Sequence, residues 1–293
     1  MSLWQGKSRG NKFGYSVFIW ILRNFGVLPA YFLLRFVAGY FFIFSITSSK
    51  ILFNFYNRRI GLTSFKSLCY IYKNYLNLGH SIIDKVVLMS GIKNNFSFNF
   101  DGEDNLHKIV DLKKGGILLS AHIGNWDIAG QLLKRLNTSI NIVIFDGEYQ
   151  KIKQYLNSVT GKSQVNVIII KDDLSHIYAI SDALAKNELI CMHADRYVEG
   201  NKTLNAVICG EEAKFPMGPF LLAATFKVPV SFVFAIKENK LHYHFYASKI
   251  IEYNHPKKEN NMQQLLQDFT GEVEIKMRQN PEQWFNYYNF WQK

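Results

Sequence analysis

Apolar positions divide the chain into an unusually apolar beginning and a longer part in which short apolar runs alternate with amphipathic stretches. Residues 15–56 carry few charges, and Gly26 and Pro29 are expected to break this region into two helices. From residue 63 to residue 91, apolar side chains recur every three or four positions, which predicts one long helix. Further helices are expected over residues 106–112, 125–136, 151–160, 175–186, 220–226 and 260–280. Near the end of the chain, the spacing of Trp284, Tyr287, Tyr288 and Trp291 predicts one aromatic helix face.

Short apolar runs bounded by turn-forming residues predict strands between these helices. The strands are expected over residues 94–102, 117–120, 140–145, 165–170, 189–193, 206–209, 230–236 and 241–248. Because strands and helices alternate, the sequence predicts an α/β fold with a mainly parallel central sheet flanked by helices. An apolar, helical, membrane-associating region precedes this fold. We therefore expect a basic arm with apolar helices over residues 1–60 and a single α/β domain over residues 61–293.

The apolar segment over residues 29–47 is close in length to the roughly 20 residues that a membrane-spanning helix needs. It carries one charge, Arg35, whose side chain can reach the interface from its position near one end. Basic residues flank the apolar region on both sides, so charge does not select an orientation. We favour a pair of helices that dips into the inner leaflet, with a spanning helix and a buried core helix of a soluble protein as alternatives.

The stretch over residues 115–136 combines a predicted strand, a turn and a predicted helix, and it carries the main candidate chemistry. His122 follows the strand, Asn125 is a plausible N-cap, and Asp127 falls in the first turn of the helix. In open α/β sheets, active sites lie beyond the carboxyl ends of the strands. The sequence therefore predicts a functional site at this turn.

A histidine and a carboxylate five residues apart form a general base if the chain turns between them. On a regular helix their side chains would point about 140° apart, but Gly124 permits a turn that brings His122 and Asp127 together. The carboxylate would hold the imidazole in one tautomer and raise the basicity of its other nitrogen. The alternative is a structural histidine, with an aspartate that the helix dipole favours.

A second polar group follows the predicted strand at 189–193, at the same edge of the sheet. It consists of His193, Asp195 and Arg196. The planar guanidinium of Arg196 suits a phosphate or a carboxylate, or it pairs with Asp195. His193 and Asp195 share a face of an extended chain, so they are a rival base pair.

Gly218 marks a proline-glycine turn that opens the helix at 220–226. Backbone N–H groups at such a helix start can bind an anion or a developing oxyanion, and a purely structural turn is the alternative.

His242 and His244 are interpreted as sheet-surface residues, because two histidines alone are too few ligands for a metal. The three cysteines suit neither a disulfide framework nor a zinc site, so no metal is expected.

Composition limits the remaining classes of protein. Hydrophobic residues make up 48% of the 293 residues and aromatic residues 15%, which excludes a disordered chain and suits a lipid pocket or a membrane interface. The formal net charge is +11, so nucleic acid, anionic lipid head groups and an acidic carrier protein are candidate partners. We find no nucleic-acid-binding motif, and a nucleic-acid binder is therefore disfavoured.

Several of these motifs together resemble a known family. Residues 121–127, AHIGNWD, resemble the His-x-x-x-x-Asp (HxxxxD) motif of the lysophospholipid acyltransferase superfamily. The Gly-Asn-Trp sequence between the histidine and the aspartate resembles the one found in the bacterial lipid A biosynthesis (late) acyltransferase-like branch of this superfamily. The step from Asp195 to Arg196 resembles an Asp-Gln pair of that branch, and residues 213–219 and 281–284 resemble its later blocks and its ending.

The resemblance implies a fatty acyltransferase at the cytoplasmic face of the bacterial inner membrane. His122 would take a proton from a hydroxyl or amine of a lipid acceptor, and Asp127 would orient it. The acceptor would attack an acyl thioester of acyl carrier protein or coenzyme A, and no cofactor is implied beyond that co-substrate. The residues assigned to substrate binding are Asn125, Trp126, Asp195, Arg196 and Gly218.

Departures from the family pattern leave the acceptor open. The chain has Arg196 where the branch carries glutamine and Asp127 where lipid A enzymes normally carry glutamate, and we find no arginine block for phosphate recognition. The acceptor is therefore a lipid A-like glycolipid, an aminolipid, a lysophospholipid or a polyene-type lipid. The alternative function is a non-catalytic lipid-binding or scaffold protein on the same fold.

Overall fold

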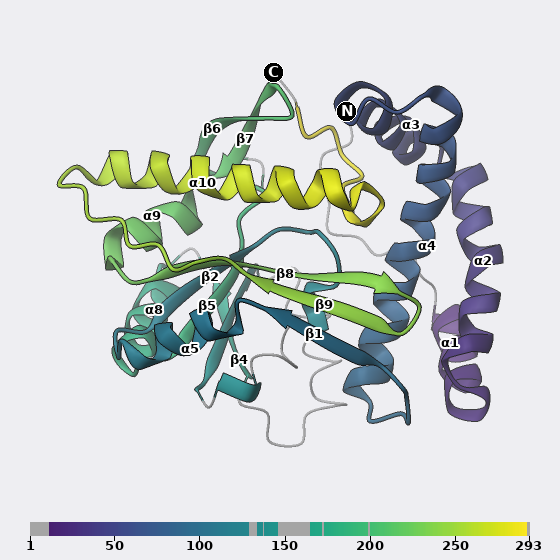
Figure 1. The fold of residues 1–293 in the computed structure, drawn as a ribbon, viewed down its shortest axis with the longest axis horizontal. Coiled ribbons are helices and arrows are strands. Elements are labelled where there is room, and N and C mark those ends of the chain that lie inside the picture. Colours follow the sequence, from purple (N-terminus) through teal and green to yellow (C-terminus); the bar gives the residue numbers. More distant parts are fainter. Residues whose placement is uncertain are drawn as a thin grey trace.

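The computed structural model has a seven-stranded central sheet with packed helices and a group of N-terminal helices at one end (Figure 1). It describes residues 12–128, 134–136, 138–145, 165–171, 173–198 and 200–291. The strands of this sheet are β1 (Ser97–Asp101), β2 (Gly116–Ser120), β3 (Ile140–Phe145), β4 (Val165–Ile170), β5 (Leu189–His193), β8 (Val230–Asn239) and β9 (His242–Ala247).

The strand order is β1-β9-β8-β2-β5-β3-β4, and every neighbouring pair is parallel except β8 with β9. The predicted mainly parallel α/β fold is thereby confirmed. The central strand β2 is buried along its whole length, as a short apolar run covered on both faces should be. A separate antiparallel hairpin, β6 (Thr203–Ile208) with β7 (Glu211–Pro216), replaces the single short strand predicted at 206–209.

Helices cover the two faces of the sheet. On one face, α9 (Met217–Phe226) packs against α10 (Lys258–Gln279), where Phe269 lies edge-on to Phe220 and to Phe232 of the sheet. On the other face, α5 (Glu103–Asp111) buries Leu106 and Ile109 in a cluster with β2. The remaining helix beside the sheet is α8 (Ser175–Ala185), which contacts β4 and β5.

The N-terminal region forms α1 (Lys12–Phe25), α2 (Val27–Phe44), α3 (Ile46–Asn54), the π-helical turn η1 (Phe55–Arg59) and α4 (Ser64–Met89). The chain breaks at Gly26 as predicted, with φ of 81°. The predicted break at Pro29 is wrong, because Pro29 lies in the first turn of α2, where its missing N–H interrupts no helical hydrogen bond. The long helix predicted over 63–91 is confirmed as α4.

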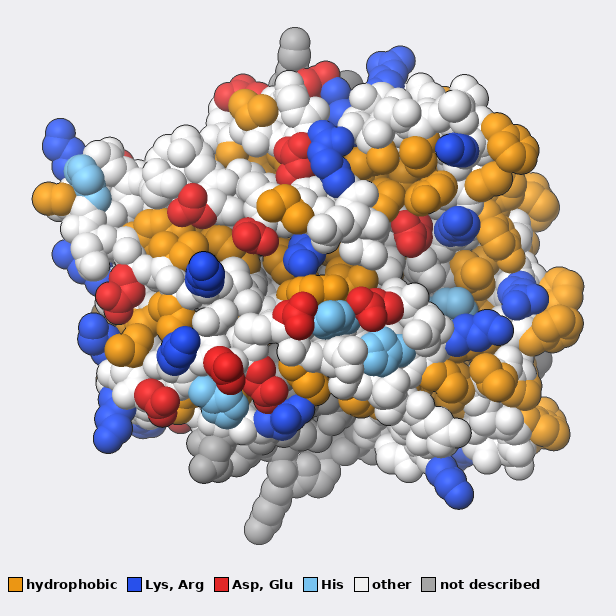
Figure 2. All heavy atoms as spheres, in the orientation of Figure 1, with side chains coloured by type: hydrophobic (Ala, Val, Ile, Leu, Met, Phe, Trp, Pro, Cys, Tyr) orange, Lys and Arg blue, Asp and Glu red, His pale blue; other side chains and the backbone are white. Residues whose placement is uncertain are grey.

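The helix α2 has one face on the protein and one face exposed. Ala30, Leu34 and Ala38 are buried, and Leu34 approaches α4 so closely that a Cβ on Gly79 would lie 2.3 Å from its Cδ1. The opposite face exposes Leu28, Phe32, Phe36, Tyr40, Ile43 and Phe44. Figure 2 shows apolar side chains gathered over this end of the molecule, with basic side chains among them. Among the described helices, α2 alone is long and apolar enough to cross a membrane.

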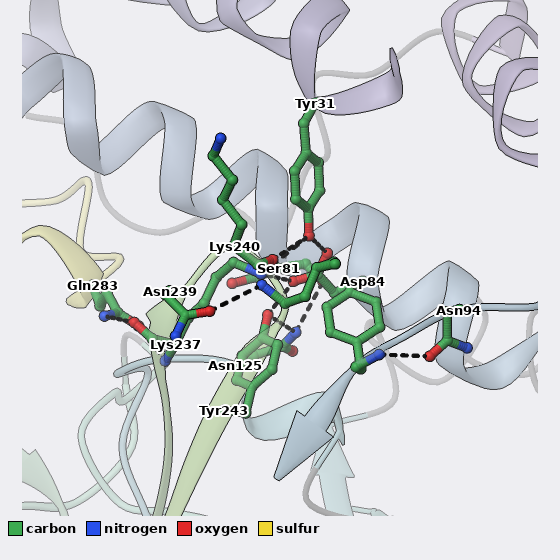
Figure 3. A network of polar contacts seen from close by, with 12 residues as sticks. Tyr31, Ser81, Asp84, Asn94, Asn125, Lys237, Asn239, Lys240, Tyr243 and Gln283 are labelled. Atoms are coloured by element: carbon green, nitrogen blue, oxygen red, sulfur yellow. Dashed lines mark hydrogen bonds and ion pairs between the residues drawn. The ribbon is translucent and has the colours of Figure 1, made fainter. Parts of the chain in front are cut away.

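A buried polar network joins α2, α4 and the sheet (Figure 3). The carboxylate of Asp84 on α4 accepts hydrogen bonds from the hydroxyls of Tyr31 on α2 and Tyr243 on β9. Lys237 Nζ on β8 lies 2.5 Å from Asp84 Oδ2 and donates to the Tyr31 hydroxyl at 3.0 Å. Burial raises the pKa of Asp84 and lowers that of Lys237, and the contact between the two groups opposes both shifts.

The C-terminal tail departs from prediction. Instead of one aromatic helix face, residues after α10 form the short turn η4 (Pro281–Gln283) and then an irregular segment. The tail satisfies its backbone through other elements: Phe285 N–H donates to the His122 carbonyl at 3.0 Å, and the Gln283 carbonyl accepts from Gly124 N–H at 2.9 Å. The helix predicted at 151–160 and the middle of the one predicted at 125–136 lie outside the described residues.

Substitution of Lys237 by Met is expected to destabilise the fold by about 3–5 kcal/mol, because it leaves the buried Asp84 carboxylate without its cation. The double variant Asp84→Leu/Lys237→Met should lose less, since no unpaired charge stays buried. Urea unfolding of the detergent-solubilised protein, followed by circular dichroism, measures both. A Lys237→Met variant as stable as the parent protein would contradict the network's role.

Candidate active site

The parallel pairing of β2 with β5 brings the two predicted polar groups to one edge of the sheet. In this register Ser120 lies opposite His193, so the residues that follow the two strands leave the sheet side by side. His122 comes from the first strand, and Asp195 and Arg196 come from the second. The prediction that these residues share the carboxyl edge is confirmed.

Both oxygens of Asp195 hold His122. Oδ1 lies 2.7 Å from His122 Nδ1, and Oδ2 accepts from the backbone N–H of His122 at 2.9 Å. Asp195 is fully buried, while the His122 side chain stays 15% exposed. Burial alone would raise the pKa of Asp195, but the neighbouring His122 and Arg196 outweigh it and hold this pKa below its ordinary value. Asp195 is thus a carboxylate, and Nε2 is the imidazole nitrogen left for proton transfer.

The predicted contact between His122 and Asp127 is not the pairing in the structure. Asp127 lies in the 3-10 turn η2 (Trp126–Ile128), and its Oδ1 is 2.7 Å from Lys85 Nζ on α4. The chain does turn at Gly124, as expected, with φ of 70°. The turn directs Asp127 toward α4, however, while the adjacent strand supplies the carboxylate of Asp195 from 73 positions away in the chain.

The alternative pairing of His193 with Asp195 is not formed either, because both carboxylate oxygens of Asp195 bond to His122. The His193 ring lies 4.4 Å from that of His122 and 4.5 Å from that of Trp126, measured between centroids. Burial, with the nearby charge of His122, lowers the pKa of His193 to about 3. His193 is therefore a neutral ring beside the catalytic candidate.

The turn after His122 is held from both sides. A Cβ on Gly124 would lie 2.0 Å from the Ala235 carbonyl oxygen, so only glycine fits there. Asn125 is buried, and its amide donates to the Ser81 carbonyl and to the Tyr243 hydroxyl, both at 3.1 Å (Figure 3). These contacts make Asn125 a residue that shapes the turn rather than a helix N-cap.

The other predicted binding residues lie in different surroundings. Trp126 packs edge-on to His122 and His193, with Lys85 Nζ 5.6 Å from its ring centroid. Arg196 donates to the Phe285 carbonyl, and its Cζ lies 5.9 Å from the Tyr288 ring centroid. Its hydrogen bond among the described residues is therefore to the tail and not to Asp195, as the alternative had it. Gly218 lies in the first turn of α9, which packs on α10 rather than on the strand ends.

The grouping of His122, His193 and Asp195 is compatible with a metal ion. One ligand atom from each lies within 4.8 Å of the others, as a site with three protein ligands requires. The two hydrogen bonds between Asp195 and His122 account for the same grouping without an ion. This arrangement suits an oriented imidazole base.

Three residues of α4 lie at the site although the sequence did not predict them there. Lys85 and Ser81 contact the turn after His122, and Asp84 contacts Tyr243, which supports that turn. The available signal was the polar group at 81–85 inside an otherwise apolar helix face, and a fully buried Asp84 is rare without partners.

Residues 9–293 match the family described as bacterial lipid A biosynthesis acyltransferase. No curated protein matches the chain. Among solved structures, the 1-acyl-sn-glycerophosphate (LPA) acyltransferase PlsC from Thermotoga maritima matches at 13% identity, over 84% of this chain and 96% of that one. The TM-score of this match is 0.37.

The family match extends over nearly the whole chain, from the basic arm to the aromatic tail, and includes both strand ends that form the site. The protein is therefore an acyltransferase, and it belongs to the bacterial lipid A biosynthesis acyltransferase family.

Proposed function

We propose that this acyltransferase moves a fatty acyl group from a thioester of acyl carrier protein or coenzyme A to a hydroxyl or amine of a lipid acceptor, with His122 as general base. The observation that carries the proposal is the hydrogen bond between His122 Nδ1 and Oδ1 of the buried Asp195, at 2.7 Å. The acceptor is a lipid A-like glycolipid, an aminolipid, a lysophospholipid or a polyene-type lipid.

In the proposed reaction, His122 Nε2 removes the proton from the acceptor while its oxygen or nitrogen attacks the thioester carbonyl carbon. The C–S bond then breaks, and the imidazolium returns the proton to the leaving thiolate. The ionised Asp195 stabilises the imidazolium between these two steps. The neutral His193 beside it adds no competing charge.

We assign Asp127 a different task from the one that its place in the motif suggests. Its ion pair with Lys85 fixes a cation beside Trp126, at a part of the site where both side chains remain about one-fifth exposed. An ammonium group held there can attract an anionic part of either substrate. Asp127 thus acts through Lys85, while Asp195 acts on the base.

We also propose that the protein binds the cytoplasmic face of the bacterial inner membrane without crossing it. The face of α2 that carries Tyr31 and Leu34 is packed on α4 and tied into the Asp84 network. That packing leaves only the opposite, aromatic face for lipid, which suits a helix lying in the interface. The net charge of +11 favours anionic lipid head groups.

Replacement of His122 by Ala is expected to abolish acylation, because removal of a general base costs about 10²–10⁴-fold in rate. Mass spectrometry of total lipids from the native host, with both proteins expressed at equal level, should show the loss of one acyl chain from a defined lipid. An unchanged profile from a folded, membrane-bound variant would favour the non-catalytic lipid-binding scaffold.

Two asparagine substitutions distinguish the carboxylates. We expect Asp195→Asn to lower kcat about 10²-fold or more, because the amide cannot stabilise the imidazolium. Asp127→Asn should change kcat less and raise KM, since it releases Lys85. Steady-state kinetics with purified donor and acceptor measure both, and a larger kcat loss in Asp127→Asn would restore the pairing expected from the motif.

Charges placed on the exposed face of α2 should release the protein from membranes. The double variant Phe32→Glu/Phe36→Glu is expected to reduce binding to anionic vesicles several-fold in a flotation assay, because two carboxylates would enter the apolar interface. Tyr178→Glu is the matched control, since Tyr178 is 76% exposed on α8. Equal flotation of the double variant and the control would exclude α2 as the lipid contact.

A further inference from the structure

A cavity of about 320 Å³ lies between the N-terminal helices and the C-terminal tail. Its walls come from α3 and η1 on one side and from residues 284–291 on the other. These segments lie at the same end of the molecule in Figure 1. We call it the arginine cavity, after Arg58 and Arg59 of η1, which line it.

The arginine cavity is positively charged. Arg59 already has partners: its two terminal guanidinium nitrogens donate to the Glu211 carboxylate, and its Cζ lies 4.9 Å from the Trp291 ring centroid. Arg58 is exposed and has neither an ion pair nor a side-chain hydrogen bond among the described residues. No acidic side chain is among the described residues of the lining. One guanidinium is thus held in place and a second is available to an anion.

Hydrogen-bond donors other than arginine also line the arginine cavity. The side chain of Trp284 forms part of the aromatic wall. Side-chain amides come from Asn54, Asn286 and Asn289. The combination of aromatic walls, amide groups and a free guanidinium is typical of a pocket for a polar anionic ligand.

The arginine cavity and the catalytic site share the tail as a common wall. Ile123, next to His122, forms a bridge with Trp284, and the Tyr288 hydroxyl donates to the Asp195 carbonyl at 3.4 Å. Trp284 and Tyr288 also line the cavity. The same tail residues therefore contact both the cavity and the segments that carry His122 and Asp195.

We propose that the arginine cavity binds the phosphate group of a substrate of the acyl transfer, an inference that rests on the proposed function. Arg58 would pair with the phosphate oxygens, since guanidinium geometry suits this group. The phosphate has two possible sources, the phosphopantetheine arm of the acyl donor or the head group of the acceptor. Arg58 would thus supply, from before the sheet, a guanidinium group for phosphate, in a chain where we find no arginine block for this purpose.

The test is calorimetric titration of the full-length protein in detergent with 4′-phosphopantetheine, glucosamine 1-phosphate and inorganic phosphate. We expect one of the two organic probes to bind, and Arg58→Ala to weaken that binding about tenfold or more. Arg58→Lys should retain part of the affinity. Lys257→Ala removes one exposed charge before α10 and should bind as the parent protein does.

The probe that binds identifies the source: 4′-phosphopantetheine the donor, and glucosamine 1-phosphate the acceptor. Binding of inorganic phosphate alone, binding of no probe, or equal binding by Arg58→Ala and the parent would each overturn the proposal. The His122→Ala variant should bind as the parent does. Failure of acyl transfer and failure of the phosphate site therefore give different results.

Discussion

The parallel pairing of β2 with β5 is the constraint on which the site depends. Its register places Ser120 opposite His193, and this sets the distance between the two chain segments that leave the sheet. Asp195 can reach both the ring and the backbone N–H of His122 only from that position. A shift of one residue would turn the alternate side chains to the opposite face and separate His122 from Asp195.

The helix α4 carries the second set of constraints. Its buried Asp84 joins α2 to β8 and β9, and its Lys85 holds Asp127. Further along the same helix, Asn74 donates to the Trp284 carbonyl at 3.0 Å and accepts from the Tyr287 hydroxyl at 2.7 Å. One helix therefore joins the apolar N-terminal layer, the catalytic turn and the tail, so the seating of α2 and the geometry of the turn are mechanically connected.

The large aromatic content has separate physical uses in different parts of the molecule. On α2 the rings of Phe32 and Phe36 are exposed, where water would disfavour them unless lipid covers them. In the tail, Trp284 and Phe290 are buried and pack edge-on against each other. Burial of these aromatic rings stabilises the position of the tail, although its backbone forms no regular helix.

The sequence by itself determined the α/β class, the position of α4, the break at Gly26 and the place of His122 just after a buried strand, because these depend on local periodicity and backbone freedom. It could not identify Asp195 as the partner of His122, since that contact joins residues from neighbouring strands and requires the strand order. The same reason hid Lys85, and it made the Pro281–Trp291 tail look helical. Tertiary structure decided these points, because hydrogen bonds between distant segments outweigh the weak preferences of short stretches.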